Sequence, residues 1–149
     1  MDKPLTVWYC DICGGRIEDI NEGYVIWKTS PGIRAENLTV IHQTKCDSND
    51  FPASAALKDF VGPEGLAYLL SFLSLGPIMA RRGQKSHSSV VDLDGFVDFV
   101  RRVQTPYYEE ARRAFGAEKL REWFSDSNEV APYLPERLKG IIEDYGTEH

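Results

Sequence analysis

Three cysteines and one histidine stand in two closely spaced pairs near the start of this 149-residue chain. Two residues separate Cys10 from Cys13, and three residues separate His42 from Cys46. Zinc binds thiolate sulfur and imidazole nitrogen in a tetrahedron, and a structural zinc site usually has four protein ligands. The pattern therefore predicts one Zn²⁺ site with Cys10, Cys13, His42 and Cys46 as ligands, which uses every cysteine of the chain.

Other interpretations of these residues stay open. Cys10 and Cys13 could form a redox dithiol, although such a pair normally begins a helix after a buried strand, and two glycines follow here. The cysteines could also be inert thiols. A zinc enzyme would need an open coordination position, which requires His42 to lie elsewhere and Asp47 or water to take its place.

Short strands are expected to position the two pairs. Residues 5–9, 23–28 and 38–42 have the β-branched and aromatic content of strands, and Ser30-Pro31-Gly32 is a turn signal between the last two. The resulting hairpin would fix the distance between the pairs and deliver His42 from the end of a strand. Tyr24 and Trp27 are expected to belong to the core, as large aromatic side chains usually do.

A Cys-x-x-Cys-Gly turn that opens a hairpin and is followed by a second ligand pair resembles treble-clef and related zinc fingers. The spacing is also similar to that of the fingers of poly(ADP-ribose) polymerases, which have two cysteines, a long hairpin, then a histidine and a cysteine. The resemblance covers about the first third of the chain and implies ligand roles for Cys10, Cys13, His42 and Cys46. It does not extend to binding DNA breaks, because one extra residue separates His42 from Cys46 and the first fifty residues carry five basic and eight acidic side chains.

After residue 50 the pattern changes to helices separated by Gly, Pro and Asn. Helices are expected at residues 52–61, from Pro63 onward, from an N-cap at Asp92 to about Gln104, from Pro106 to Gly116, around residues 120–124, and from Pro135 to about Gly146. The sequence thus predicts an α+β fold. A small β-rich zinc-binding module at residues 1–49 would precede an all-helical domain at residues 50–149, and the two could share one core.

The most apolar run, residues 66–80, is interrupted by serines and by Gly76-Pro77 and is too short to span a bilayer. It predicts a buried helix. The N-terminus lacks the basic start and apolar run of a signal peptide. We therefore expect a cytoplasmic protein with reduced cysteines and no membrane partner.

Two double-arginine pairs, Arg101–Arg102 and Arg112–Arg113, suggest nucleic-acid binding at first sight. However, Asp98 and Glu109 each lie three and four residues before one of the pairs, the spacing at which ion pairs form along a helix. The pairs are therefore expected to lie on solvated, locally neutralised faces.

The segment 79–89 has no carboxylate and carries Arg81, Arg82, Lys85 and His87. This uncompensated positive patch could contact a phosphate, an acidic partner or RNA, although a solvated connector is the simpler interpretation.

The composition and net charge limit the classes of function that this chain can have. The chain is 42% hydrophobic and 27% charged, as globular proteins are, and its formal charge of −6 disfavours general attraction to nucleic acid. No phosphate-binding glycine loop, nucleophile motif or paired catalytic acids stand out. The sequence therefore favours a non-enzymatic module that carries a structural zinc and binds a protein partner. A nucleic-acid-binding regulator that uses the finger and the loop 81–87, and a zinc-dependent enzyme, are the alternatives.

Overall fold

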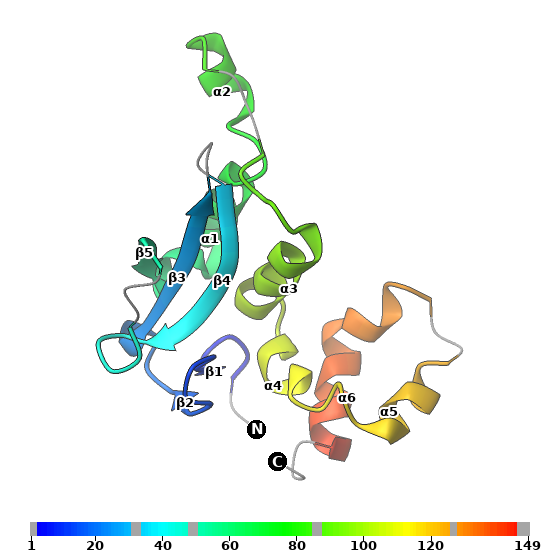
Figure 1. The fold of residues 1–149 in the computed structure, drawn as a ribbon. Helices are drawn as coiled ribbons and strands as arrows, with labels where there is room; N and C mark the ends of the chain where they lie inside the picture. The colour runs from blue at the N-terminus through cyan, green and yellow to red at the C-terminus, as the bar shows by residue number, and fades with distance from the viewer. Residues whose placement is uncertain (1–2, 31–33, 48–50, 85–87, 126–127, 146–149) are drawn as a thin grey trace.

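The computed structural model describes residues 3–30, 34–47, 51–84, 88–125 and 128–145 (Figure 1). Its strands are β1 (Trp8–Tyr9), β2 (Arg16–Ile17), β3 (Gly23–Ser30), β4 (Arg34–His42) and β5 (Ala53–Ala56). Its α-helices are α1 (Gly62–Ser71), α2 (Gly76–Arg81), α3 (Leu93–Gln104), α4 (Tyr108–Arg112), α5 (Glu118–Trp123) and α6 (Pro135–Tyr145). Short 3₁₀ helices are η1 (Ile20–Glu22), η2 (Leu57–Phe60) and η3 (Ala131–Tyr133). The predicted α+β class, with sheets before helices, is confirmed.

The strands form two small antiparallel sheets. The strands β1 and β2 pair across the turn that contains Cys13, and a three-stranded sheet has the order β4-β3-β5. The predicted hairpin is the β3–β4 pair, in which Gly23 lies opposite His42. The prediction of a helix at residues 52–61 is wrong, because β5 and η2 occupy this segment. Pairing with β3 supplies the backbone hydrogen bonds of β5, and such tertiary pairing overrides the helix preference of alanine.

One hydrophobic core joins the sheets to α1 and α3. It includes Trp8 and Ile26 from the strands and Phe99 from α3. The predicted core residue Trp27 is buried, and its ring meets those of Phe60 and Phe72 edge to face. Apolar packing thus joins residues on both sides of the domain boundary that the sequence predicted between residues 49 and 50, which lie outside the described residues; that boundary stays a prediction.

A second cluster lies among α4, α5 and α6. Its buried members are Tyr108, Ala111, Ala114, Leu120, Leu138 and Ile141. Figure 1 shows these helices grouped on one side of α3, away from the three-stranded sheet. The α4 helix therefore connects the two clusters and follows directly on the end of α3.

The apolar run at residues 66–80 departs from its prediction as one buried helix. It is divided between α1 and α2, and Leu70 and Ile78 are 53% and 75% exposed. Gly76 has a φ of +80°, a conformation that suits glycine, and Pro77 follows it at the start of α2. Among the described residues, no helix combines the length and apolar character that a membrane span requires.

Candidate metal centre

The four predicted ligands lie together. One donor atom from each of Cys10, Cys13, His42 and Cys46 lies within 4.8 Å of the donors of the other three. A tetrahedral zinc with Zn–S near 2.3 Å and Zn–N near 2.0 Å requires ligand atoms about 3.5 to 3.8 Å apart. The Sγ atoms of Cys13 and Cys46 lie 3.3 and 3.8 Å from Nδ1 of His42, so the cluster fits one such ion with small adjustments.

The first pair lies in a tight turn between β1 and β2. Gly14 adopts a φ of +75°, which lets its N–H bond the carbonyl of Cys10 at 2.9 Å. The amides of Ile12 and Cys13 point at Sγ of Cys10 from 3.4 and 3.5 Å, and the amide of Gly15 points at Sγ of Cys13 from 3.4 Å. These donors favour thiolate sulfur, the form that binds metal.

The second pair is delivered by the end of β4 and the turn after it. His42 is the last residue of β4, and the amide of Cys46 donates to its carbonyl at 3.2 Å. The imidazole Nε2 lies 3.0 Å from the carbonyl oxygen of Arg16 in β2, so Nε2–H donates there. The Nδ1 lone pair is then directed at the sulfurs, as is usual for a histidine that binds metal.

The thiols of the cluster differ in acidity. Burial raises the pKa of Cys10, but donation from the backbone around Cys13, His42 and Ile12 outweighs it and lowers the pKa to about 6. Burial, hydrogen bonding with Cys10 and Cys13, and their negative charge raise the pKa of Cys46 to about 11. A cation among the sulfurs would offset this repulsion, so metal binding should release a proton from Cys46.

The redox and enzyme interpretations gain no support from this geometry. Cys10 and Cys13 lie in a turn between strands, whereas a redox pair normally begins a helix. Asp47 is exposed and outside the cluster, and His42 is inside it. Four converging donors, with Cys10 and Cys46 buried, are typical of a closed structural site.

The sequence did not reveal a buried ion-pair network beside the cluster. Arg102 of α3 donates from Nη1 to Oδ2 of Asp11 at 2.8 Å and from Nη2 to the carbonyl of Tyr9 at 3.2 Å. Its Nε and Nη2 also bond the two carboxylate oxygens of Glu109 at 2.6 and 2.9 Å. Burial alone would lower the pKa of Arg102, but Glu109 and Asp11 outweigh it and raise the pKa further. The guanidinium therefore stays charged, and its bonds link the turn that carries Cys10 and Cys13 to α3 and α4.

The structure corrects the expectation that both arginine pairs lie on solvated faces. Arg102 and its partner Glu109 are only 3% and 2% exposed. Arg112 pairs with Asp98 at 3.1 Å. Arg101 stacks 3.9 Å above the ring of Tyr133, and Arg113 stacks 4.1 Å above the ring of Tyr9. Helical spacing could not reveal these partners, because most of them lie on other elements.

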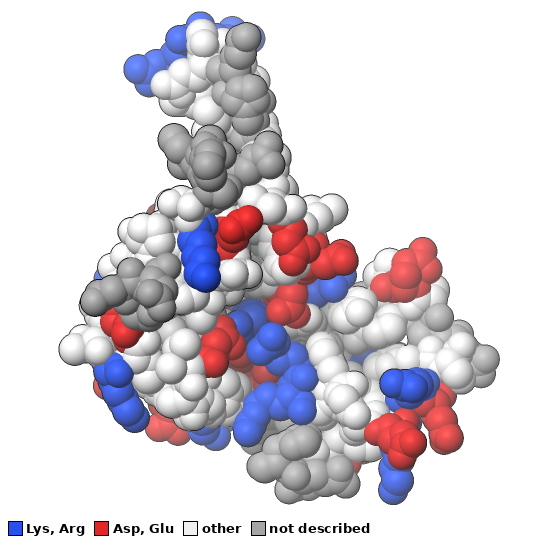
Figure 2. Space-filling model, viewed as in Figure 1, with Lys and Arg blue, Asp and Glu red and all other residues white. Residues whose placement is uncertain are grey.

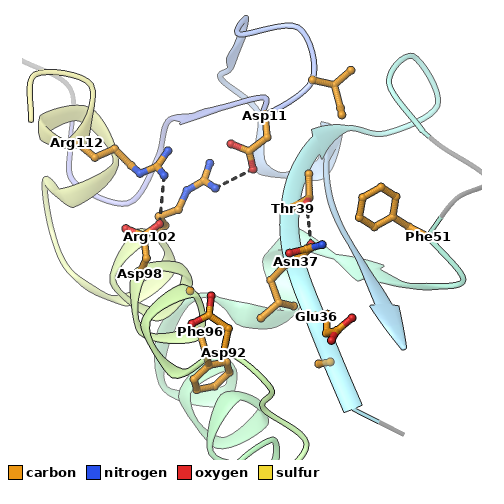
Figure 3. Close-up of a pocket in the computed structure, with 14 residues that line it drawn as sticks. Asp11, Glu36, Asn37, Thr39, Phe51, Asp92, Phe96, Asp98, Arg102 and Arg112 are labelled. Atoms are coloured by element: carbon orange, nitrogen blue, oxygen red, sulfur yellow. Dashed lines mark hydrogen bonds and ion pairs between the residues drawn. The ribbon is translucent and has the colours of Figure 1, made fainter. Parts of the chain in front are cut away.

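The ion pairs line one end of a cleft of about 530 Å³ between β4 and α3 (Figure 3). Asp11 and Ile12, from the cysteine turn, also line it. The remaining lining combines both charges with apolar side chains, namely Ala35, Glu36, Asn37, Leu38, Thr39, Phe51, Asp92, Gly95, Phe96, Asp98, Arg102 and Arg112. The turn that carries Cys10 and Cys13 is therefore accessible from the surface through this cleft.

The predicted positive patch lies elsewhere. Arg81 ends α2 and Arg82 caps it, and both are exposed. Figures 1 and 2 show α2 projecting from the body, with basic side chains at its far end, well away from β1 and β2. Lys85 and His87 lie outside the described residues. Arg81 and Arg82 therefore do not adjoin the four clustered cysteine and histidine ligands.

Comparisons of the chain with protein-family models, with curated proteins and with solved structures gave no significant match.

Proposed function

We propose that this chain is a zinc-stabilised interaction module that binds one structural Zn²⁺ through Cys10, Cys13, His42 and Cys46 and presents a surface to a protein partner. The observation that carries this proposal is the convergence of four donors on one point. Backbone amides support Cys10 and Cys13, and the Arg16 carbonyl orients His42. Three thiolates and one imidazole favour zinc over the hard, oxygen-preferring cations.

The proposed module is finger-like in its ligand arrangement. A Cys-x-x-Cys-Gly turn precedes the β3–β4 hairpin, and the second ligand pair follows it, as in the treble-clef-like fingers that the sequence resembles. In this chain Cys46 comes from a turn rather than from a helix, and the first α-helix of the described residues begins at Gly62. The finger would thus serve to fix the position of the hairpin and of the cleft beside it.

The cleft supports a protein partner over a nucleic acid. Asp11 and Ile12 extend the metal-bound turn into the cleft, and Ile12 is 56% exposed. Both of the cleft's arginines are paired with carboxylates, Arg102 with Asp11 and Glu109, and Arg112 with Asp98. A surface with mixed charges and apolar side chains suits a polypeptide, whereas a phosphate backbone requires unpaired positive charge.

Metal analysis tests the structural site. Native mass spectrometry of protein purified without added metal should find one zinc per chain, and His42→Ala should lose it. The neighbouring exposed Gln43, replaced by alanine, is the matched control and should retain zinc. Cobalt substitution should give the intense absorption of a tetrahedral thiolate site that added small anions do not alter. Zinc-free protein with an unchanged circular dichroism spectrum would contradict the proposal.

Photo-crosslinking tests the surface. A photoreactive residue in place of Ile12, in the cleft, should capture a protein in the cells from which the chain derives. The same residue in place of Leu134 is the control, because Leu134 is similarly exposed but belongs to a different surface. Capture of protein from position 12 but not from position 134 is expected. Capture of nucleic acid from position 12 would support the alternative function.

A further inference from the structure

Helix α2 lies on an arm, which we define as residues 73–84, that projects from the body between α1 and α3 (Figure 1). No residue of α2 is buried. Leu73, Leu75 and Ile78 are 38%, 40% and 75% exposed, so the described part of the chain leaves these side chains in water. A single exposed leucine is ordinary, but several large apolar side chains on one short projection mark a surface that binds something apolar.

Local hydrogen bonds give the arm a defined shape, although no core supports it. The Ser74 hydroxyl accepts the N–H of Gly76, the first residue of α2, at 3.2 Å. After α2, the amide of Gly83 donates to the carbonyl of Ala80 at 3.0 Å, and the φ of +82° at Gly83 suits this helix ending. The arm therefore presents its apolar side chains on a formed helix, which reduces the ordering cost of binding.

The arm is positively charged, whereas the whole chain carries a formal charge of −6. Arg81 ends α2, Arg82 caps it, and both are exposed. Residues 65–91 contain no Asp or Glu, and neither arginine forms an ion pair with a described residue. Figure 2 shows basic side chains at the far end of the projection and acidic side chains on the body. The arm therefore holds unpaired positive charge away from the acidic body.

The side chains of the arm match the outer layers of an anionic bilayer. Ile78 lies three and four residues before Arg81 and Arg82, which places the three on one side of the helix. Lipid phosphates lie just outside the acyl chains, so an isoleucine can enter the acyl boundary while neighbouring guanidinium groups bind phosphates. A nucleic acid also offers phosphates, but its backbone offers no apolar layer for Ile78.

We propose that the arm docks this protein on an anionic membrane surface, with Leu75 and Ile78 in the acyl boundary and Arg81 and Arg82 on headgroup phosphates. Each arginine near such a surface strengthens binding about fivefold, and burial of an isoleucine strengthens it about tenfold or more, which gives reversible attachment. Such docking needs no membrane-spanning helix. It departs from the sequence-based expectation of no membrane partner and goes beyond the proposed zinc-dependent function, because it uses no residue of the metal centre or of the cleft.

Co-sedimentation of the full, zinc-loaded chain with sucrose-filled vesicles tests the docking. Vesicles of phosphatidylcholine with about 30% phosphatidylserine should retain the wild type, whereas phosphatidylcholine alone should not. Retention should fall as NaCl rises from about 0.05 to 0.5 M, because salt screens the charge of the arginines. Ile78→Ser and Arg81→Ser should each weaken binding, by about tenfold and about fivefold respectively.

Val130→Ser and Lys119→Ser are the matched controls. Val130 is 61% exposed, Lys119 is exposed on α5, and neither belongs to the arm. Both control variants should bind the anionic vesicles as the wild type does. Because α2 has no buried residue, the two arm variants should keep the circular dichroism spectrum of the wild type, so a loss of binding reports the contact itself.

A wild type that remains in the supernatant with anionic vesicles would overturn the inference, as would equal binding by Ile78→Ser. Retention of an RNA oligonucleotide that depends on Arg81 but not on Ile78, without vesicle binding, would assign the arm to nucleic acid instead. Zinc is measured on the same samples. A chain with one zinc that does not bind vesicles refutes only the membrane contact, and vesicle binding by a chain that purifies without zinc refutes only the metal site.

Discussion

The guanidinium of Arg102 lies 2.8 Å from the carboxylate of Asp11, although Arg102 comes 91 positions after Asp11 in the chain. The same Asp11 oxygen accepts the N–H of Val40 at 2.8 Å, and the Asp11 amide donates to the carbonyl of Val40 at 2.7 Å. Asp11 follows Cys10, and Val40 lies two residues before His42. Asp11 therefore links both halves of the cysteine–histidine cluster to each other and to α3.

Replacing Arg102 with methionine should destabilise the protein strongly. Methionine fills similar space but leaves Glu109 buried and without its cation, which typically costs about 3 to 5 kcal/mol. Urea unfolding of the zinc-loaded protein, followed by circular dichroism, measures the loss.

Arg101→Met is the matched control for Arg102→Met. Arg101 is only half-buried and stacks on Tyr133, so its loss should cost about 1 kcal/mol or less. If both variants unfold at the same urea concentration, the buried network does not stabilise the fold as argued.

Replacing Asp11 with alanine should weaken zinc binding without removing a ligand. The cysteine turn would lose its side-chain bonds to Val40 and Arg102, and the loss of such supporting groups typically lowers metal affinity about 10- to 100-fold. Competition with a chelator measures the affinity. Glu18→Ala removes an exposed ion pair with Arg16 and should leave the affinity unchanged. Equal affinities in the two variants would show that Asp11 does not position the cluster.

The sequence was sufficient to predict the turns, strands and helices that depend on the spacing of nearby residues. The gap of two residues between Cys10 and Cys13 predicted the turn that brings the two thiols together. The β-branched strands predicted the hairpin that carries His42, although the Pro-Gly turn signal between them lies outside the described residues. The helix from Leu93 to Gln104 was also predicted, with Asp92 at its N-cap position. In each case the sequence signal lies within a short segment of the chain, even though the hairpin strands pair residues as far apart as Gly23 and His42.

Long-range partners could not be predicted in this way. The helical spacing of Asp98 and Arg102 indicated an ion pair on a solvated face, whereas the tertiary fold buries Arg102 against Asp11 and Glu109. Likewise, the apolar periodicity of the α1 sequence predicts that the helix has one apolar face, but it does not show which part of the protein packs against that face. Leu70 is exposed because α3 covers only part of that face.

A substitution at Gly65 should disrupt the contact between α1 and η2. A Cβ on Gly65 would overlap the carbonyl carbon and oxygen of Phe60, and these backbone atoms cannot move without shifting a core residue. We expect Gly65→Ala to cost about 3 kcal/mol, as severe overpacking does. Gly116→Ala is the control, because its Cβ would meet nothing within 4 Å. Equal thermal unfolding temperatures in these two variants would contradict the close approach.

Alkaline unfolding should depend on Tyr108. Burial, followed by its hydrogen bond to Asp98 and the charge of Asp98, raises the pKa of Tyr108, and Arg112 and Arg101 offset this only in part. A phenol whose pKa is higher in the folded state keeps its proton there after the unfolded chain has lost it. Its contribution to stability is thus complete below the unfolded pKa of about 10 and is lost as pH rises toward the folded pKa.

Tyr108→Phe should therefore flatten the fall in unfolding free energy above pH 10, while it lowers stability at neutral pH by about 1 kcal/mol through the lost hydrogen bond. Urea titrations at a series of pH values from 7 to 11 measure both effects. Tyr145→Phe serves as the comparison, because Tyr145 packs against the same apolar cluster from α6, and its replacement should leave the slope as it is in the wild type. A slope unchanged by Tyr108→Phe would mean that the phenol of Tyr108 ionises equally readily in the folded and unfolded chains.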